Sequence, residues 1–297
     1  MPNLQSASVA QANAPDVLYK SELNISWPAI AWFGALLALC YAPVLSLLVR
    51  QWNNDADMGH GFFVPVVAAY IAWQKKDELA GVPVQPNRWG ILIVVYGALQ
   101  VLIATMGAEL FLARTAFVIS VVGLVLALGG TRYLKVFAFP LFLLIFMVPI
   151  PGVIYNKITF PLQIVASQAA EKALSILNIP VLREGNVLEL PSQTLNVVEA
   201  CSGIRSLLSL TFVSLVFGYF FEKKAWIRAV LFFSTIPIAI LANAGRVTLT
   251  GILAETKPEL AEGFFHAVSG LIIFLIAMLI MAAWHQLLTK GSKLVTR

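Results

Sequence analysis

The chain has 297 residues and a formal net charge of +5, from 20 Lys and Arg against 15 Asp and Glu. Hydrophobic residues make up 59% of it and charged residues 12%, whereas soluble domains have about 45–50% and about 25%. This composition excludes a soluble globular fold and a disordered chain, and two cysteines exclude a disulfide-stapled secreted scaffold. It indicates an integral membrane protein whose basic residues mark cytoplasmic loops, not a nucleic-acid site.

The first 26 residues are polar and lack the regions of a signal peptide, so we expect a loose N-terminal tail. Beyond them, apolar runs recur that can cross about 30 Å of hydrocarbon at about 1.5 Å per residue. They predict an all-α polytopic membrane protein with about eight transmembrane helices. The expected spans are 27–49, 61–74, 89–106, 110–129, 133–149, 203–221, 226–245 and 265–288. We interpret 27–288 as one transmembrane domain and 289–297 as a basic C-terminal tail.

The distribution of lysine and arginine between the short loops sets the expected orientation. More of these residues lie on the side of the N-terminus, in the loops after the second, fourth and sixth spans and in the C-terminal tail. We therefore predict that both termini are cytoplasmic.

The 150–202 segment differs in character from the spans around it. Residues 158–177 predict an amphipathic helix at the outer interface, because polar side chains interrupt what would otherwise span: Gln163, Gln168, Glu171 and Lys172. The following residues alternate in polarity, with turn signals at Gly185-Asn186 and Pro191-Ser192, which predicts a short hairpin. We expect this hairpin to roof a cavity at the outer surface, where non-helical backbone is tolerated.

Three residues that can carry chemistry come to the outer face of the membrane in this topology. Cys201 lies where the sixth span begins, and a helix N-terminus favours the nucleophilic thiolate. Arg246 lies near the outer end of the seventh span and His266 at the start of the eighth. A Cys–His pair activates a nucleophile, and an arginine can stabilise an oxyanion, so together the three predict a catalytic site.

Each of these residues also has an ordinary structural explanation. A cysteine in an apolar chain is usually a small buried hydrophobe, an arginine at a helix end usually extends to the interface, and an interfacial histidine is usually a satisfied polar group. Their convergence favours a site. Three neighbours are expected to support it: Asn243, three residues before Arg246 on nearly the same helical face; Arg205, one turn after Cys201; and Glu199, able to pair with either arginine.

The other histidines test the choice of base. His285 follows His266 by 19 residues, about 28 Å along a helix, so we place it at the cytoplasmic face. His60 is expected on the outer side with Asp55 and Asp57. These three give too few ligands for a convincing metal site, and no metal or other cofactor is predicted. We favour a loop, containing Asp57 and His60, that lines the site or contacts substrate.

At these residues the sequence resembles the exosortases and archaeosortases. The resemblance rests on E-A-C-S-G-I-R, N-A-G-R and F-F-H-A-V-S-G in that order on successive expected helices, together with D-M-G-H-G-F-F-V-P and M-V-P-I-P earlier in the chain. It implies a membrane cysteine protease or transpeptidase with Cys201, Arg246 and His266 as catalytic residues. It further implies a bacterial inner-membrane enzyme, often associated with exopolysaccharide production.

The implied partners are secreted precursor proteins with a C-terminal sorting signal: a Pro-Glu-Pro-type motif, a transmembrane helix and a basic tail. An acyl-enzyme thioester would be released by water or by an amine on a lipid or glycan acceptor, and the sequence does not choose between them. Two other classes stay open. A transporter or polymer-export component would show interrupted helices near the midplane and often internal repeats, neither of which is evident from the sequence. An intramembrane serine protease would use Ser202 or Ser269, but Ser202 lacks a nucleophile elbow.

Overall fold

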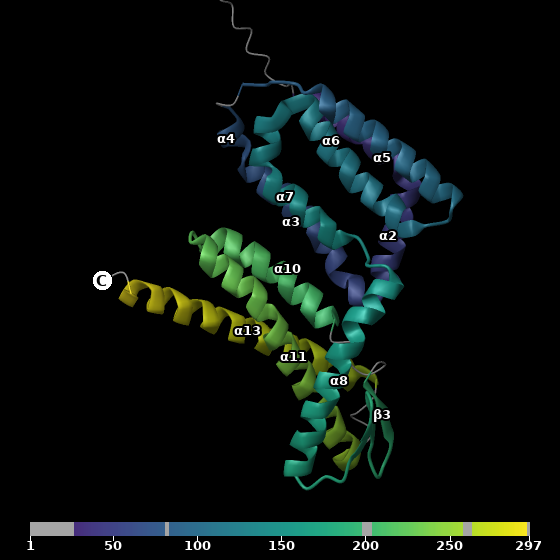
Figure 1. The fold of residues 1–297 in the computed structure, drawn as a ribbon, viewed down its shortest axis with the longest axis vertical. Helices are drawn as coiled ribbons and strands as arrows, with labels where there is room; N and C mark the ends of the chain where they lie inside the picture. Colours follow the sequence, from purple (N-terminus) through teal and green to yellow (C-terminus); the bar gives the residue numbers. More distant parts are fainter. Residues whose placement is uncertain (1–26, 81–82, 198–203, 258–262, 296–297) are drawn as a thin grey trace, which may run out of the picture.

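A computed structural model describes residues 27–80, 83–197, 204–257 and 263–295, and these are almost entirely helical (Figure 1). The chain is an all-α polytopic membrane protein with one small sheet. Within the described ranges, five helices are long and apolar enough to cross a membrane, or up to seven if each of two bent helix pairs is one span. The predicted number of eight is therefore not reached by this measure. The N-terminal tail lies outside the described residues.

The first expected span, 27–49, is broken. It forms α1 (Trp27–Cys40) and α2 (Ala42–Asn54), which meet at 74°. Tyr41 stands at the bend, and its hydroxyl lies 2.8 Å from Ser120 Oγ. Pro43 begins the new helix, where its missing N–H costs nothing. A 3₁₀ segment η1 (Ala56–Phe62) then leads to α3 (Phe63–Gln74) and the short α4 (Lys76–Ala80).

The third and fourth expected spans are confirmed as a tightly packed pair, α5 (Arg88–Met106) and α6 (Leu110–Val136). Their close approach depends on small residues, as is common between membrane helices. A Cβ placed on Gly90 would lie 2.2 Å from the backbone nitrogen of Ala127. Near its end α6 bends at Gly130, which has φ +79°. A Cβ there would lie 1.8 Å from the carbonyl oxygen of Gln85, so this position accepts only glycine.

A second bent pair follows. The helix α7 (Ala138–Leu143) and the 3₁₀ segment η2 (Leu144–Met147) meet α8 (Gly152–Ile176) at 86° after the prolines of M-V-P-I-P. The helix predicted over 158–177 is confirmed as part of α8. Two of its four polar residues have protein partners: Gln163 is buried and accepts a hydrogen bond from Asn186 (3.2 Å), and Glu171 pairs with Arg183 (2.7 Å). They hold the next segment against α8.

That segment is an antiparallel sheet of β1 (Leu182–Glu184), β2 (Val187–Glu189) and β3 (Thr194–Asn196). Both predicted turns are present, and Gly185 adopts φ +65° in the first. Buried side chains of the sheet join α8 and α11 in one apolar core: Ala170, Leu174, Leu188, Leu190, Leu195, Val197, Val247 and Ala254. The cavity expected beneath this segment stays a prediction.

The last three long helices pack on one another (Figure 1). They are α10 (Ile204–Phe221), α11 (Ala225–Thr256) and α13 (Gly263–Val295), and they match the last three expected spans with longer bounds for α11 and α13. Leu210, Ile227, Leu231, Ile238 and Met281 are the large side chains buried between them. Because α11 and α13 exceed the roughly 20 residues needed to cross hydrocarbon, their ends reach beyond it.

A buried carboxylate–imidazole contact joins the α10–α11 connection to α13. Glu222 Oε2 lies 3.2 Å from His285 Nε2, and Glu222 Oε1 accepts hydrogen bonds of 2.8 Å from the amides of Lys223 and Lys224. Burial alone would raise the pKa of Glu222, but the two amides and the imidazole outweigh it and lower the pKa. The pair places His285 level with this connection, far along α13 from its first turn.

We predict an acid-sensitive contribution of Glu222 to stability. A carboxyl with a depressed pKa stabilises the fold above its ordinary pKa, about 4.3, and this contribution is lost as pH falls through the lower folded value. The parent should therefore lose thermal stability on acidification more steeply than Glu222→Gln, measured as unfolding temperature against pH in detergent. Glu78→Gln, an exposed carboxylate, is the matched control. Parallel acid profiles for the parent and Glu222→Gln would contradict the prediction.

Candidate active site

The η1 turn supplies a carboxylate that joins three distant parts of the chain. Asp57 Oδ1 accepts a hydrogen bond from Arg205 Nε (2.9 Å) in the first turn of α10. Its Oδ2 accepts one from the Tyr155 hydroxyl (2.5 Å) near the start of α8. Asp55 fixes the turn by accepting from the Asp57 amide (3.0 Å). Asp57 is thus held from both sides, and it holds the α8 and α10 ends together.

We predict that the two contacts of Asp57 differ in strength. The Arg205 side chain is 45% exposed and that of Asp57 16%, so this ion pair should contribute at most about 1 kcal/mol. The Tyr155 hydroxyl bonds a charged acceptor, which is typically worth about 1.5–3 kcal/mol. Double-mutant cycles of thermal unfolding, with Asp57→Asn against Tyr155→Phe and against Arg205→Gln, should give the larger coupling for Tyr155. Equal couplings would show that the arginine carries as much as the tyrosine.

A second group of side chains lies where α11 meets α13. A Cβ built on Gly270 would lie 3.1 Å from Cζ and from Nη2 of Arg246, so the guanidinium rests directly on the α13 backbone. Gly270 is four residues after His266, which puts the two positions on one face of α13, a turn apart. The backbone of His266 belongs to α13, but its side chain is outside what the structure describes. Cys201 and Glu199 fall in 198–203, also outside the described residues.

Asn243 connects the two groups. It is buried, one turn before Arg246, and lines a small cavity with Leu162 of α8 and Leu207 of α10. Leu207 is two residues after Arg205, so the first turns of α10 and this part of α11 adjoin. The structure therefore brings Arg205, Asn243 and Arg246 to one end of the helical group, and Asp57 joins them through Arg205.

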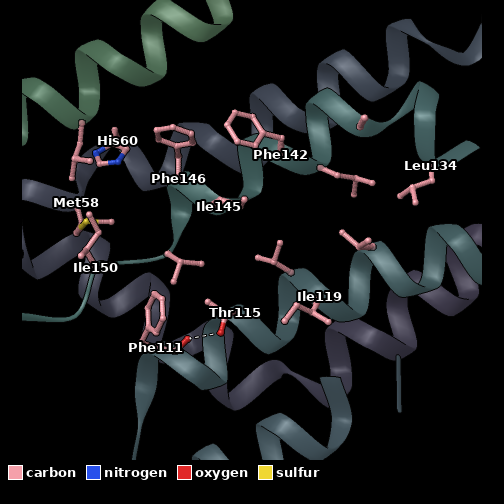
Figure 2. Close-up of a pocket in the computed structure, with 16 residues that line it drawn as sticks. Met58, His60, Phe111, Thr115, Ile119, Leu134, Phe142, Ile145, Phe146 and Ile150 are labelled. Atoms are coloured by element: carbon pink, nitrogen blue, oxygen red, sulfur yellow. Dashed lines mark hydrogen bonds between the residues drawn. The ribbon is translucent and has the colours of Figure 1, made fainter. Parts of the chain in front are cut away.

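His60 belongs to the same η1 turn but faces elsewhere. It is 9% exposed and lines a large apolar cavity (Figure 2). Burial lowers its pKa, with the backbone of Phe146 and Asp57 opposing the shift, so the imidazole is neutral at pH 7. Its Nδ1 has no hydrogen-bond partner among the described residues. Across residues 27–80, 83–197, 204–257 and 263–295, no group of three or more His, Cys, Asp or Glu is arranged to hold a metal ion.

Sequence reasoning missed three residues near these groups. Tyr155 carries no sequence signal, because its role depends on a partner 98 residues away. Gly270 could have been found, since the His-x-x-x-Gly spacing places it a turn from His266. Arg114 could also have been found as a charge inside an apolar span. It is 4% exposed, and its Nε has no partner among the described residues.

The fold and this arrangement define the class as a polytopic membrane protein with polar groups collected at the ends of its helices. Comparison with protein families identifies the family. The model of the family described as transmembrane exosortase (Exosortase_EpsH) matches residues 52–283, well over half of the chain. The chain therefore belongs to the transmembrane exosortases. No curated protein and no solved structure gives a match.

Proposed function

We propose that this transmembrane exosortase is a cysteine endopeptidase or transpeptidase that cleaves C-terminal sorting signals of secreted proteins at the outer membrane–water interface. The substrates would be precursors with a Pro-Glu-Pro-type motif before a transmembrane helix. Residues 27–288 would form the single catalytic domain, in a bacterial inner membrane with both termini cytoplasmic. Family membership supports the general class. The assignment of roles to residues rests on geometry.

The observation that carries the proposal is the packing of Arg246 on Gly270, one turn beyond His266. It means that a guanidinium and the histidine-bearing turn of α13 occupy one small region. The number of residues between Cys201 and Arg205 places the third proposed catalytic residue near the other two. Cys201 is four residues before Arg205, so their Cα atoms are at most about 14 Å apart. Arg205 in turn belongs to the helix end that adjoins Asn243 and Arg246.

In the proposed mechanism the Cys201 thiolate attacks the scissile carbonyl carbon. His266 takes the thiol proton and later gives it to the leaving amine, while Arg246 donates hydrogen bonds to the tetrahedral oxyanion. The resulting thioester is released by water, or by an amine on a lipid or glycan acceptor.

The supporting residues have narrower proposed roles. Arg205 uses Nε for Asp57, which leaves its terminal nitrogens to bind the acidic residue of the substrate motif. Asn243 would orient a substrate carbonyl, and the Glu199 carboxylate would form an ion pair with Arg205 or Arg246. Asp57 would position Arg205 without touching substrate.

A non-catalytic transporter or polymer-export component is the second candidate, because one observation favours it. The sequence showed no interrupted helices, but the structure has two bent pairs, α1–α2 and the α7–η2 segment with α8. Broken helices are typical of transporters. A transporter does not require a thiol, so Cys201 decides between the candidates.

The test is co-expression with a precursor that carries a candidate sorting signal, followed by its size on a gel. The parent should process the precursor, and Cys201→Ser should leave it intact at equal membrane abundance. Cys40→Ser is the matched control, because Cys40 is the other cysteine and ends α1 with an exposed side chain. Undiminished processing by Cys201→Ser would exclude the cysteine mechanism.

We also predict that Cys201 is on the extracytoplasmic side. In a Cys40→Ser background, which removes the other thiol, a membrane-impermeant maleimide should label intact cells through Cys201. The reason is the excess of Lys and Arg in the loops expected inside. Labelling that requires permeabilised cells would reverse the topology and place Arg246 and His266 on the cytoplasmic side.

A further inference from the structure

A long apolar cavity lies between α6 and the α7–η2 segment. Its volume is about 700 Å³, within the roughly 300–1,000 Å³ typical of ligand pockets. Figure 2 shows two facing rows of side chains, with Phe142, Ile145 and Phe146 on one side and Phe111, Thr115 and Ile119 on the other. Almost all of the lining is apolar, so a charged or strongly polar ligand would not be stable along its length.

The two ends of this cavity differ. Leu134 closes one end, and Met58, His60 and Ile150 close the other (Figure 2). His60 is more than nine-tenths buried, and its Nδ1 has no hydrogen-bond partner among the described residues. Buried polar atoms are normally bonded, so an unpartnered ring nitrogen at the cavity wall indicates a polar group of a ligand.

Arg114 is a second buried polar residue on α6. It stands between Phe111 and Thr115, which both line the cavity, but it is not itself part of the lining. It is 4% exposed, and within the described part of the chain its Nε has no acceptor. The polar end of the cavity is therefore the imidazole of His60, whose ring nitrogen can exchange a hydrogen bond with a polar group of a lipid.

The length and lining of the cavity favour a hydrocarbon chain as its occupant. The lining residues from Phe111 to Val122 cover about 17 Å of α6. Because nearly all of the lining along that length is apolar, an extended acyl chain can stay in contact with it throughout.

We propose that this cavity binds one acyl chain of a membrane phospholipid, with the glycerol ester and phosphate at the His60 end and the terminal methyl towards Leu134. Phospholipid surrounds every membrane-spanning helix, so no other apolar chain is present at comparable concentration. This lipid site is separate from the proposed catalytic function, and the proposal of a lipid site does not depend on that function. It joins η1, which carries Asp57, to α6 and η2 through a bound molecule.

The test uses the full chain in vesicles of phosphatidylethanolamine and phosphatidylglycerol that contain a photoreactive phosphatidylethanolamine. Two probes are compared, one with a diazirine close to the ester and one with a diazirine near the terminal methyl. After illumination, labelled residues are mapped by mass spectrometry. The ester-proximal probe should label the Met58, Ile150 and Phe111 end, and the terminal probe should label Leu134 and Ala138.

A cavity-filling variant provides the second arm. Ile119→Trp should lower labelling of the lining residues at least fivefold for both probes. Ile103→Trp, at a 66% exposed position on α5, is the matched control and should leave that labelling unchanged. If Ile119→Trp does not fold, the two-probe pattern of the parent decides. Identical patterns for the two probes, or lining residues labelled no more than exposed residues of α5, would overturn the proposal. So would capture of a sorting-signal helix in this cavity instead of lipid.

Discussion

Replacement of Arg246 by lysine should lower substrate processing by about 10²–10³-fold, although the positive charge is kept. Removal of one oxyanion donor typically costs that much, and a flexible ammonium does not reproduce the fixed fork of a guanidinium. The structure adds a second reason. The Arg246 guanidinium packs against Gly270, and a lysine has no planar group to pack there. The measurement is the rate of precursor processing at matched membrane abundance.

A change at Gly270 separates this role from a purely topological one. In Gly270→Ala the new Cβ would lie 3.1 Å from Cζ and Nη2 of Arg246, so the guanidinium must move by a few tenths of an ångström or more. Processing should fall several-fold while the charge and the membrane orientation stay the same. Full activity of both Arg246→Lys and Gly270→Ala would leave Arg246 as an interfacial anchor without a part in catalysis.

Removal of the base should abolish both acylation and release. In His266→Ala the Cys201 thiol loses its proton acceptor and the imidazolium that stabilises the thiolate. We expect no cleavage and no trapped thioester from this variant. His60→Ala should be milder, with weaker processing but a detectable acyl-enzyme, because His60 lines the apolar cavity.

His285→Ala completes the comparison as a folding control. Its ring is paired with the buried Glu222, so its loss should lower the unfolding temperature, while processing per folded molecule stays close to the parent. Cleavage and thioester are measured for all three variants at equal abundance of folded protein. If cleavage survives His266→Ala and disappears with His60→Ala, the base lies on the η1 turn and the assignment of His266 is wrong.

Local patterns in the sequence were sufficient for much of the fold. The α5–α6 pair, the three long C-terminal helices and the turn at Gly185 depend on apolar run length and turn residues within a few positions. The two helix bends were not predicted, because hydropathy gives the length of an apolar run and does not show where the helix changes direction. Tyr41 bends its run through a contact with Ser120, and that contact requires α6 to be in place.

The polar residues of α8 make contacts that the sequence did not predict. Polar side chains in an apolar stretch were interpreted as a helix at the membrane interface, and that placement stays a prediction. In the structure Gln163 contacts Asn186, and Glu171 contacts Arg183. A polar side chain in a membrane protein needs a partner, and the sequence alone does not say whether that partner is water or protein.

The sequence predicted the residues of the candidate site, but it did not predict the hydrogen bonds that join its segments. Asn243 lines a cavity with Leu207, two residues after Arg205, and Arg246 follows Asn243 by three residues on α11. The pairing of Asp57 with Arg205 and Tyr155 was not foreseen, because Asp57 was considered only with its neighbours in the loop. Cys201, Glu199 and the side chain of His266 lie outside the described residues, so their roles stay predictions.

The Asp57–Arg205 contact also has a consequence for biogenesis. The two residues are 148 positions apart, and ribosomes add about 5–20 residues per second. Asp57 therefore leaves the ribosome about 7–30 s before its partner is synthesised. During that interval the N-terminal helices insert before the Arg205 contact of Asp57 can form, and the junction between η1, α8 and α10 is completed only when α10 is synthesised. A nascent chain that stalls before residue 205 already contains α6 and the α7–η2 segment, but it lacks Arg205. The junction that holds the proposed site is therefore completed late in translation.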